Sequence, residues 1–315
     1  SKLNHKLELY STIRNGRETV TSKLSGVVPP MTTPFDANGD IDLRAVKTQV
    51  DWCVDQGAHG LAVGGSTGEG HTLDVEEFRD LIEAAVEASA GRVPIIAGII
   101  VDSTRDAIRR GKAVADMDVA ALQVTPVHYL FRPSDDAMQE HFRVMGEETG
   151  QDILIYNVIP WSYLSPELLC KIMREVPQVV GVKQSAGDLK MLADLMLMCQ
   201  PEDRIFSAVD ALLYPSYALG ACGSIAATLS AIPGPCVEQW DAVQAGDHVR
   251  AKALHEKILP MWNAIVADNL PACTKYAQTI QGCPGLYPRA PMPEASDDQK
   301  TAIRKALTDL GIAIS

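Results

Sequence analysis

The chain has 315 residues, of which 46% are hydrophobic and 22% charged, which suits one large globular domain with an ample core. Its formal net charge of −12 argues against a nucleic-acid partner, because the phosphate backbone attracts basic surfaces. No apolar run reaches membrane-spanning length and no signal peptide opens the sequence, so we expect a cytoplasmic protein without a membrane partner.

Residues 1–25 carry several basic side chains with little apolar periodicity, and we expect them to form an arm ahead of the folded domain. A transit peptide is the alternative, although Glu8 and Glu18 interrupt the acid-poor composition of such peptides.

From Gly26 to Gly246, short apolar runs alternate with stretches whose apolar residues recur at helical spacing. Eight strand–helix pairs of this kind favour an α/β fold of the (β/α)8 TIM-barrel type over a doubly wound open sheet, which periodicity alone does not exclude. The expected strands are 26–30, 60–64, 93–98, 120–125, 152–157, 179–183, 204–209 and 223–227. The expected helices are 43–56, 74–88, 104–115, 138–148, 166–174, 189–199, 211–219 and 236–245.

After Gly246 the alternation stops, and helices are expected at 248–266, 270–280 and 296–310. We therefore expect a catalytic barrel over residues 26–246. A small helical region over 247–315 would follow it and act as a cap or an oligomer surface.

The seven cysteines are scattered and odd in number, and no Cys-x-x-Cys pair occurs among them. We expect small core residues of a reduced protein rather than a disulfide framework or a zinc site. They are Cys53, Cys170, Cys199, Cys222, Cys236, Cys273 and Cys283.

One lysine, Lys183, lies at the carboxyl end of the apolar run that starts at Val179. Such a run, closed by Gly187 and Asp188, is typical of a strand buried on both faces. A lysine there is costly unless its charge is paired or suppressed. Desolvation would lower its pKa and leave a free amine that attacks carbonyl carbons. The alternative is a side chain that reaches solvent or pairs with a carboxylate.

Further polar side chains lie at the other strand ends, where barrel enzymes place their chemistry. An amine in this setting can attack a ketone to give a carbinolamine and then an imine, an electron sink for making or breaking carbon–carbon bonds. A phenol can relay the protons, and hydroxyls beside the N–H groups of a glycine-rich turn can hold a carboxylate. The ordinary alternatives are a half-buried strand tyrosine and a capped turn. The candidates are Ser66, Thr67, Tyr129, Tyr156, Lys183, Ser185 and Asp210.

Three other classes of function would make different demands on the same residues. Residues 64–68 match the Gly-x-Ser-x-Gly pattern of a serine hydrolase with Ser66 as nucleophile. Asp210 followed by His248 or His255 would complete its chain order. A metal-dependent lyase would need a cluster of ligands at the strand ends, which the sequence lacks. A non-catalytic binding protein would keep the hydroxyls but form no imine.

The motifs at the strand ends, with Lys183 among them, resemble the dihydrodipicolinate synthase / N-acetylneuraminate lyase family of class I, Schiff-base lyases. The matches follow family order across the barrel, and the helical tail also fits. The resemblance implies a TIM barrel, usually a tetramer, that needs no metal or organic cofactor and binds pyruvate or another 2-oxo acid as an imine. The matching stretches are 64–69, 124–126, 156–158, 181–188 and 220–226.

By this resemblance, Lys183 matches the Schiff-base lysine and Tyr156 the proton-relaying tyrosine. Ser66 and Thr67 match the pair that binds the carboxylate of the 2-oxo acid, and Thr67 also joins the relay.

The same resemblance places Ile225 or Ala226 where a backbone group near the pyruvate is expected. A second relay tyrosine, contributed by a neighbouring subunit, would lie within residues 125–131. Tyr129 is the candidate, and His128 competes with it.

The sequence departs from the family where the second substrate would bind. Dihydrodipicolinate synthases usually have an arginine shortly after Tyr-Asn-Val that binds the carboxylate of aspartate semialdehyde, and residues 156–163 contain none. In the sialic-acid lyase branch, the positions of Ser185 and Asp210 touch the sugar chain. Here Ala211 replaces the acidic residue that usually follows, and Trp161 adds bulk.

The sequence therefore predicts a Schiff-base-forming lyase or aldolase that acts on pyruvate or another 2-oxo acid through Lys183. Its co-substrate would be an aldehyde or a sugar acid, and we expect a homotetramer. Dihydrodipicolinate synthase proper (4-hydroxy-tetrahydrodipicolinate synthase) and a 2-keto-3-deoxy sugar acid dehydratase are the alternatives within the family.

Overall fold

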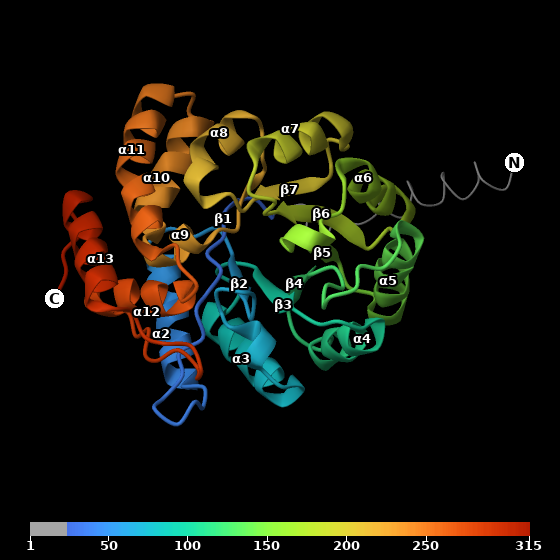
Figure 1. Cartoon of the computed structure of the whole chain (residues 1–315), viewed down its shortest axis with the longest axis horizontal. Helices are drawn as coiled ribbons and strands as arrows, with labels where there is room; N and C mark the ends of the chain where they lie inside the picture. Colours follow the sequence, from blue (N-terminus) through green and yellow to red (C-terminus); the bar gives the residue numbers. More distant parts are fainter. Residues whose placement is uncertain (1–23) are drawn as a thin grey trace, which may run out of the picture.

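The computed structural model describes residues 24–315, so the expected arm lies outside the described residues except for Leu24 and Ser25. Eight parallel strands form one sheet in the order β1-β8-β7-β6-β5-β4-β3-β2, with helices around it (Figure 1). The strands are β1 (Gly26–Val27), β2 (Leu61–Val63), β3 (Ile95–Ile99), β4 (Val119–Val124), β5 (Ile153–Asn157), β6 (Val179–Gln184), β7 (Arg204–Ser207) and β8 (Gly223–Ser224).

The sheet closes into a barrel between β1 and β2. The N–H of Met31 donates to the carbonyl of Ala62 at 2.8 Å, and the N–H of Ala62 donates to the carbonyl of Pro29 at 3.0 Å. Pro29 and Pro30 have no amide hydrogen, which explains why the regular ladder of β1 is so short. The expected (β/α)8 barrel is confirmed.

The helices on the outside of the barrel begin at capping side chains. An Asp or Ser oxygen accepts a backbone N–H at the start of each of the helices α2 to α7, as is typical of N-caps. These helices are α2 (Leu43–Asp55), α3 (Val75–Ser89), α4 (Thr104–Ala113), α5 (Asp135–Thr149), α6 (Pro166–Glu175) and α7 (Leu189–Met198).

The connections differ from the sequence prediction after β7 and β8. The helix expected at 211–219 begins as a 3-10 turn, η4 (Asp210–Leu212), followed by α8 (Leu213–Ala218). A short helix that the sequence did not predict, α9 (Ala227–Ala231), precedes α10 (Pro233–Gln244). It has no side-chain cap, which is the signal that would have marked its start. Two further 3-10 turns are η2 (Gly70–Thr72) and η3 (Pro160–Ser162).

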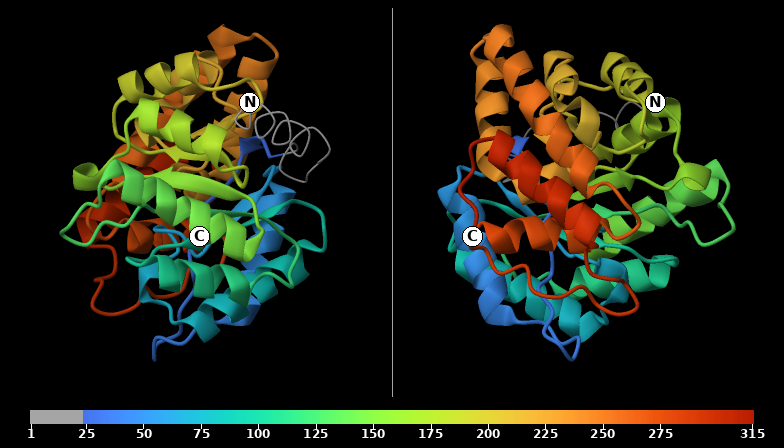
Figure 2. Two further views of the ribbon diagram at one scale, coloured as in Figure 1. Left: turned by 90° about the vertical axis from the view of Figure 1, so that its right-hand side faces the viewer. Right: turned by 60° about the vertical axis from the view of Figure 1, so that its left-hand side comes forward.

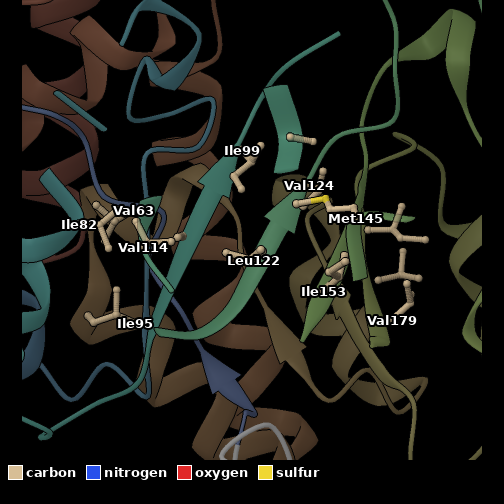
Figure 3. Close-up of a cluster of buried hydrophobic side chains, with 14 of the residues drawn as sticks. Val63, Ile82, Ile95, Ile99, Val114, Leu122, Val124, Met145, Ile153 and Val179 are labelled. Atoms are coloured by element: carbon tan, nitrogen blue, oxygen red, sulfur yellow. The ribbon is translucent and has the colours of Figure 1, made fainter. Parts of the chain in front are cut away.

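Buried apolar side chains form two layers around the strands. Residues such as Ile95 and Leu122 face outward and pack with Ile82 and other helix side chains (Figure 3). Ile96, one residue along β3, belongs instead to a smaller cluster that includes Phe206 and fills the barrel. This alternation is what a strand buried on both faces requires.

The C-terminal helices α11 (His248–Ile265), α12 (Leu270–Ile280) and α13 (Asp297–Asp309) lie along one side of the barrel (Figures 1 and 2). Their buried side chains share a cluster with Val27 of β1 and Leu213 of α8. The domain boundaries expected at residues 25 and 246 stay predictions. All seven cysteines are free thiols. None of the helices in the described part of the chain is long and apolar enough to cross a membrane.

Candidate active site

One cavity of about 270 Å³ lies at the carboxyl ends of the strands and collects most of the predicted site residues. Small residues and the C-terminal helices complete its wall, through Ala208, Ala226, Ala227, Trp262, Leu270 and Pro271. The predicted residues that line it are Ser66, Thr67, Tyr156, Lys183, Ser185, Asp210 and Ile225.

Lys183 is the buried amine of this cavity, with 3% of its surface exposed. It lies in register with Tyr156 on the neighbouring strand, and its Nζ is 3.7 Å from the centre of that ring. Burial lowers the pKa of Lys183 to about 7, while the nearby charge of Asp210 acts in the opposite direction. A large fraction of the amine is therefore uncharged near neutral pH and able to act as a nucleophile.

Tyr156 supplies a phenol beside this amine. Burial raises the pKa of Tyr156 to about 12, and a hydrogen bond with the Ser66 side chain opposes that rise. The phenol therefore keeps its proton at neutral pH and can pass it along the hydrogen bond to Ser66.

The turn of residues 64–69 enters the barrel mouth because glycines let two backbones touch. Gly64 has a φ of +76°, which favours glycine. A Cβ on Gly98 of β3 would lie 2.6 Å from the amide nitrogen of Gly65, so β3 also needs a glycine there. The Thr33 hydroxyl donates to the carbonyl of Gly68 at 2.6 Å and fixes the far side of the turn. This packing carries Ser66 and Thr67 to the cavity.

Asp210 follows β7, the neighbour of β6, and lines the same cavity as the amine. Its Oδ1 accepts hydrogen bonds from the N–H of Thr228 at 2.7 Å and from the Thr228 hydroxyl at 2.8 Å. Burial raises the pKa of Asp210 to about 6, while the bonds from Thr228 and the charge of Lys183 work against that rise. Thr228 was not predicted, because its role depends on α9, which had no local signal.

Two other predicted residues lie on the cavity wall with part of their hydrogen-bonding capacity used. The Ser185 hydroxyl is 3.5 Å from the carbonyl of Ala208, which is a long hydrogen bond. The N–H of Ile225 donates to the carbonyl of Ser207 at 2.9 Å. A ligand contact with the backbone of Ile225 would therefore use its carbonyl group.

Tyr129 and His128 do not line the cavity of their own chain. Both backbone N–H groups donate to Asp102 Oδ1 at 2.8 Å, which holds the loop outward and leaves Tyr129 70% exposed. The indole N–H of Trp161 donates to the carbonyl of His128 at 2.7 Å, so this loop and η3 form one surface. The structure therefore places Tyr129 on the surface, outside the cavity that contains Lys183.

The C-terminal wall was the largest part of the site that sequence reasoning missed. Trp262 of α11 and Leu270 and Pro271 of α12 line the cavity, although they read as core residues of a helical tail. Their apolar spacing is the same whether a helix packs on a core or on a substrate, so no sequence signal marks them.

The residues needed for the other classes of function are not assembled here. No histidine is among the described residues that line the cavity, and His248 lies instead beside the Tyr214 hydroxyl at 3.4 Å. Within residues 24–315, Ser66 thus has no imidazole base of the kind a serine hydrolase uses. Between residues 24 and 315, no group of three or more His, Cys, Asp or Glu side chains could hold a metal ion.

Comparisons with known proteins point the same way as this geometry. The family model described as "Dihydrodipicolinate synthetase family" matches residues 23–310. The 4-hydroxy-tetrahydrodipicolinate synthase of Methanopyrus kandleri is 33% identical over 92% of this chain and 97% of its own. That of Bradyrhizobium diazoefficiens is 32% identical over 92% and 98%. The crystal structure of dihydrodipicolinate synthase from Aquifex aeolicus superposes with a TM-score of 0.87 at 26% identity, over 93% of this chain and 100% of that one.

Proposed function

The chain belongs to the dihydrodipicolinate synthetase family and is a lyase of the class I aldolase type, and from that premise we propose that Lys183 captures pyruvate or another 2-oxo acid as an imine. The observation that carries the proposal is a buried amine with a pKa of about 7 against the face of a protonated phenol. The imine would then serve as the electron sink for making or breaking a carbon–carbon bond.

The first step is attack of the uncharged Lys183 amine on the keto carbon. The carbonyl oxygen gains a proton as the carbinolamine forms, and the nitrogen loses one. Tyr156 is placed to exchange these protons, with Ser66 and Thr67 beside it as the remaining hydroxyls. Tyr156 would then donate a proton to the carbinolamine hydroxyl, which leaves as water and gives the protonated imine. Return of the C3 proton to the Tyr156 phenolate would give the enamine nucleophile.

The carboxylate of the 2-oxo acid would lie against the turn of residues 64–69. The hydroxyls of Ser66 and Thr67 and the N–H groups of the turn are donors of the kind that bind anionic oxygens. This placement would hold the keto carbon over the Lys183 amine, and positioning of this kind contributes much of the rate of two-component reactions.

For the second substrate we propose an uncharged aldehyde that carries a hydroxyl group. The remaining wall offers the Asp210 carboxylate, the Ser185 hydroxyl and the apolar side chains of Trp262 and Leu270. The described residues that line this cavity include no arginine that could pair with a second carboxylate. Such a carboxylate would instead face the negative charge of Asp210. A hydroxyl could donate to the carboxylate without that repulsion.

The test of the imine is reductive trapping with pyruvate and borohydride. One reduced pyruvyl group should add to the protein, and peptide mapping should place it on Lys183. The Lys183→Ala protein should not be labelled, whereas Lys190→Ala should be labelled as the parent is, because Lys190 is an exposed lysine of α7. Equal labelling of the Lys183→Ala protein at another residue would refute the assignment.

The second substrate is tested by a panel of aldehydes with pyruvate held constant. Glyceraldehyde and other neutral hydroxyaldehydes should be consumed faster than aldehydes that carry a carboxylate. A clear preference for aspartate semialdehyde would overturn this part of the proposal and favour dihydrodipicolinate synthase activity. Release of water without carbon–carbon bond formation from a 2-keto-3-deoxy sugar acid would favour the dehydratase.

We also propose a homotetramer in which Tyr129 enters the cavity of a neighbouring subunit and completes the proton relay. Tyr129, Leu130 and Phe131 are 70%, 69% and 80% exposed, which is unusual for three consecutive large apolar side chains. Light scattering tests the tetramer. Mixing inactive Lys183→Ala and Tyr129→Phe proteins should restore activity if the tyrosine acts across subunits, and no recovery would refute it. The expected cytoplasmic location stays a prediction.

A further inference from the structure

Glu69 ends the turn that carries Ser66 and Thr67, and it has no part in the mechanism described above. Its side chain is fully buried, and its backbone has a φ of +53°, which is uncommon for a residue with a Cβ. Its N–H donates to the carbonyl of Ser66 at 3.0 Å, so the position of Glu69 is tied directly to that of Ser66.

The two carboxylate oxygens of Glu69 are held by the C-terminal region. Oε1 accepts from the ammonium group of Lys275 in α12 at 2.6 Å, and Oε2 accepts from the N–H of Arg289 at 2.8 Å. Lys275 is itself 1% exposed and also donates to the carbonyl of Tyr287 at 2.7 Å. A residue more than two hundred positions away thus fixes the end of the turn.

A hollow also lies beside this attachment. A cavity of about 630 Å³, separate from the one that contains Lys183, has Glu69, Thr72 and Arg289 in its wall. Glu69 is fully buried, so its carboxylate needs partners within the protein in place of water. The position of this carboxylate therefore depends on the hydrogen bonds from Lys275 and Arg289.

The helix that supplies Lys275 also supplies part of the active-site wall. Leu270 and Pro271, in the first turn of α12, line the cavity that contains Lys183. The same rigid helix therefore touches the proposed second-substrate half of the cavity and holds the turn on the carboxylate half.

We propose that Lys275 is a positioning residue, which through Glu69 holds the hydroxyls of Ser66 and Thr67 where they bind the carboxylate of the 2-oxo acid. The inference rests on the proposed function of Lys183. A buried ion pair is a poor source of stability, since well-packed apolar residues often replace one at no cost. What the pair gives this turn is a fixed position.

The test compares imine formation with two ketones, pyruvate and hydroxyacetone, by reductive trapping. Only pyruvate has the carboxylate that the turn would hold, and the proton relay is common to both. The parent should therefore prefer pyruvate strongly. In Lys275→Met the ratio of the two trapping efficiencies should fall by about tenfold or more, because small misplacements of binding groups have effects of this size. Lys275→Arg, which keeps the charge and the donors, should recover part of the ratio.

Ile303→Ala is the matched control for lost stability. Ile303 is fully buried in α13, in the same C-terminal region. It belongs neither to the Glu69–Lys275 pair nor to the lining of the active-site cavity. It should lower the melting temperature and leave the ratio unchanged. A Lys275→Met protein that behaves like this control, with both ketones trapped more slowly and the ratio intact, would show a purely structural role.

Two further outcomes of the trapping experiment also have a definite meaning. Should Lys275→Met be insoluble because Glu69 is left as an unpaired buried charge, the double variant Glu69→Gln with Lys275→Met removes both charges and is measured in the same way. An unchanged ratio in that protein overturns the proposal. Absence of trapping with either ketone in the parent would count against the function of Lys183 instead.

Discussion

The rate of imine formation should depend on pH with a midpoint near 7, which is the pKa that burial gives Lys183. The pH sets the fraction of the Lys183 amine that carries no proton, and the measured quantity is the rate of imine formation. Because only that form attacks a carbonyl, the rate should rise as pH increases through 7 and then level off.

The size of the effect on the uncharged fraction follows from the pKa of Lys183 and that of an ordinary lysine. At pH 7 about half of the Lys183 side chains would be uncharged, against about one in three thousand for a lysine of pKa 10.5. This difference corresponds to roughly 5 kcal/mol between the charged and uncharged forms. It is large enough that a model amine such as N-α-acetyl-lysine should show no plateau in the same pH range.

Asp210 allows the cause of the shift to be tested. Its negative charge raises the pKa of Lys183 against the effect of burial. Removing that charge in Asp210→Asn should therefore lower the pKa further and move the rate profile to more acidic pH. The two groups titrate close together, so the acidic limb of the parent profile belongs to the pair. In the Asn variant it should become a single titration.

The assay is single-turnover trapping of pyruvate with cyanoborohydride from pH 5 to pH 10, read by intact mass, with Lys183→Ala as the blank. A parent rate that keeps rising to pH 10 without a plateau, like that of the model amine, would refute a desolvated lysine. A shift of the Asp210→Asn profile toward higher pH would refute the assigned direction of the Asp210 effect.

Three more changes have expected outcomes of other kinds. Tyr156→Phe should keep the fold, by circular dichroism, and lose about 10²- to 10⁴-fold of turnover, whereas an unchanged rate would remove the relay role. Thr228→Val deletes one of the bonds that lower the pKa of Asp210, so Asp210 should lose its charge at higher pH and the rate profile should move to more acidic pH, as in Asp210→Asn; no movement would contradict the contact. Gly98→Ala should destabilise the barrel by about 1–3 kcal/mol in urea titration and weaken pyruvate binding, because its Cβ would lie 2.6 Å from Gly65; wild-type values for both would contradict this packing.

The barrel was predictable because its signals are local and repeated. Each strand is a short apolar run, and the helices from α2 to α7 begin at an Asp or Ser that the sequence displays. Lys183 could be singled out for the same reason, since a charged residue at the end of an apolar strand conflicts with burial unless it has a function. The residues at the ends of neighbouring strands then follow from topology alone.

The rest of the site depends on contacts between distant segments, which leave no periodic trace. Trp262 and Leu270 line the cavity only because α11 and α12 fold back over the barrel mouth. The pairing of Glu69 with Lys275 joins two residues whose sequence contexts, a glycine-rich turn and an amphipathic helix, each look complete without the other. The role expected for Tyr129 needs a second subunit, so no contact within one chain could reveal it.

Two groups that are costly to bury, Lys183 and Asp210, lie in one cavity, and their pKa values suggest why. Desolvation is the largest effect on both pKa values. It lowers that of Lys183 and raises that of Asp210, so that the two values, about 7 and about 6, lie close together. In that range a modest change in the surroundings is enough to transfer a proton, whereas ordinary values near 10.5 and 3.8 would fix both charges. An amine that must be uncharged to attack and must carry charge as an imine needs such a setting. The unfavourable burial of these two residues is therefore explained as a requirement of the proposed chemistry.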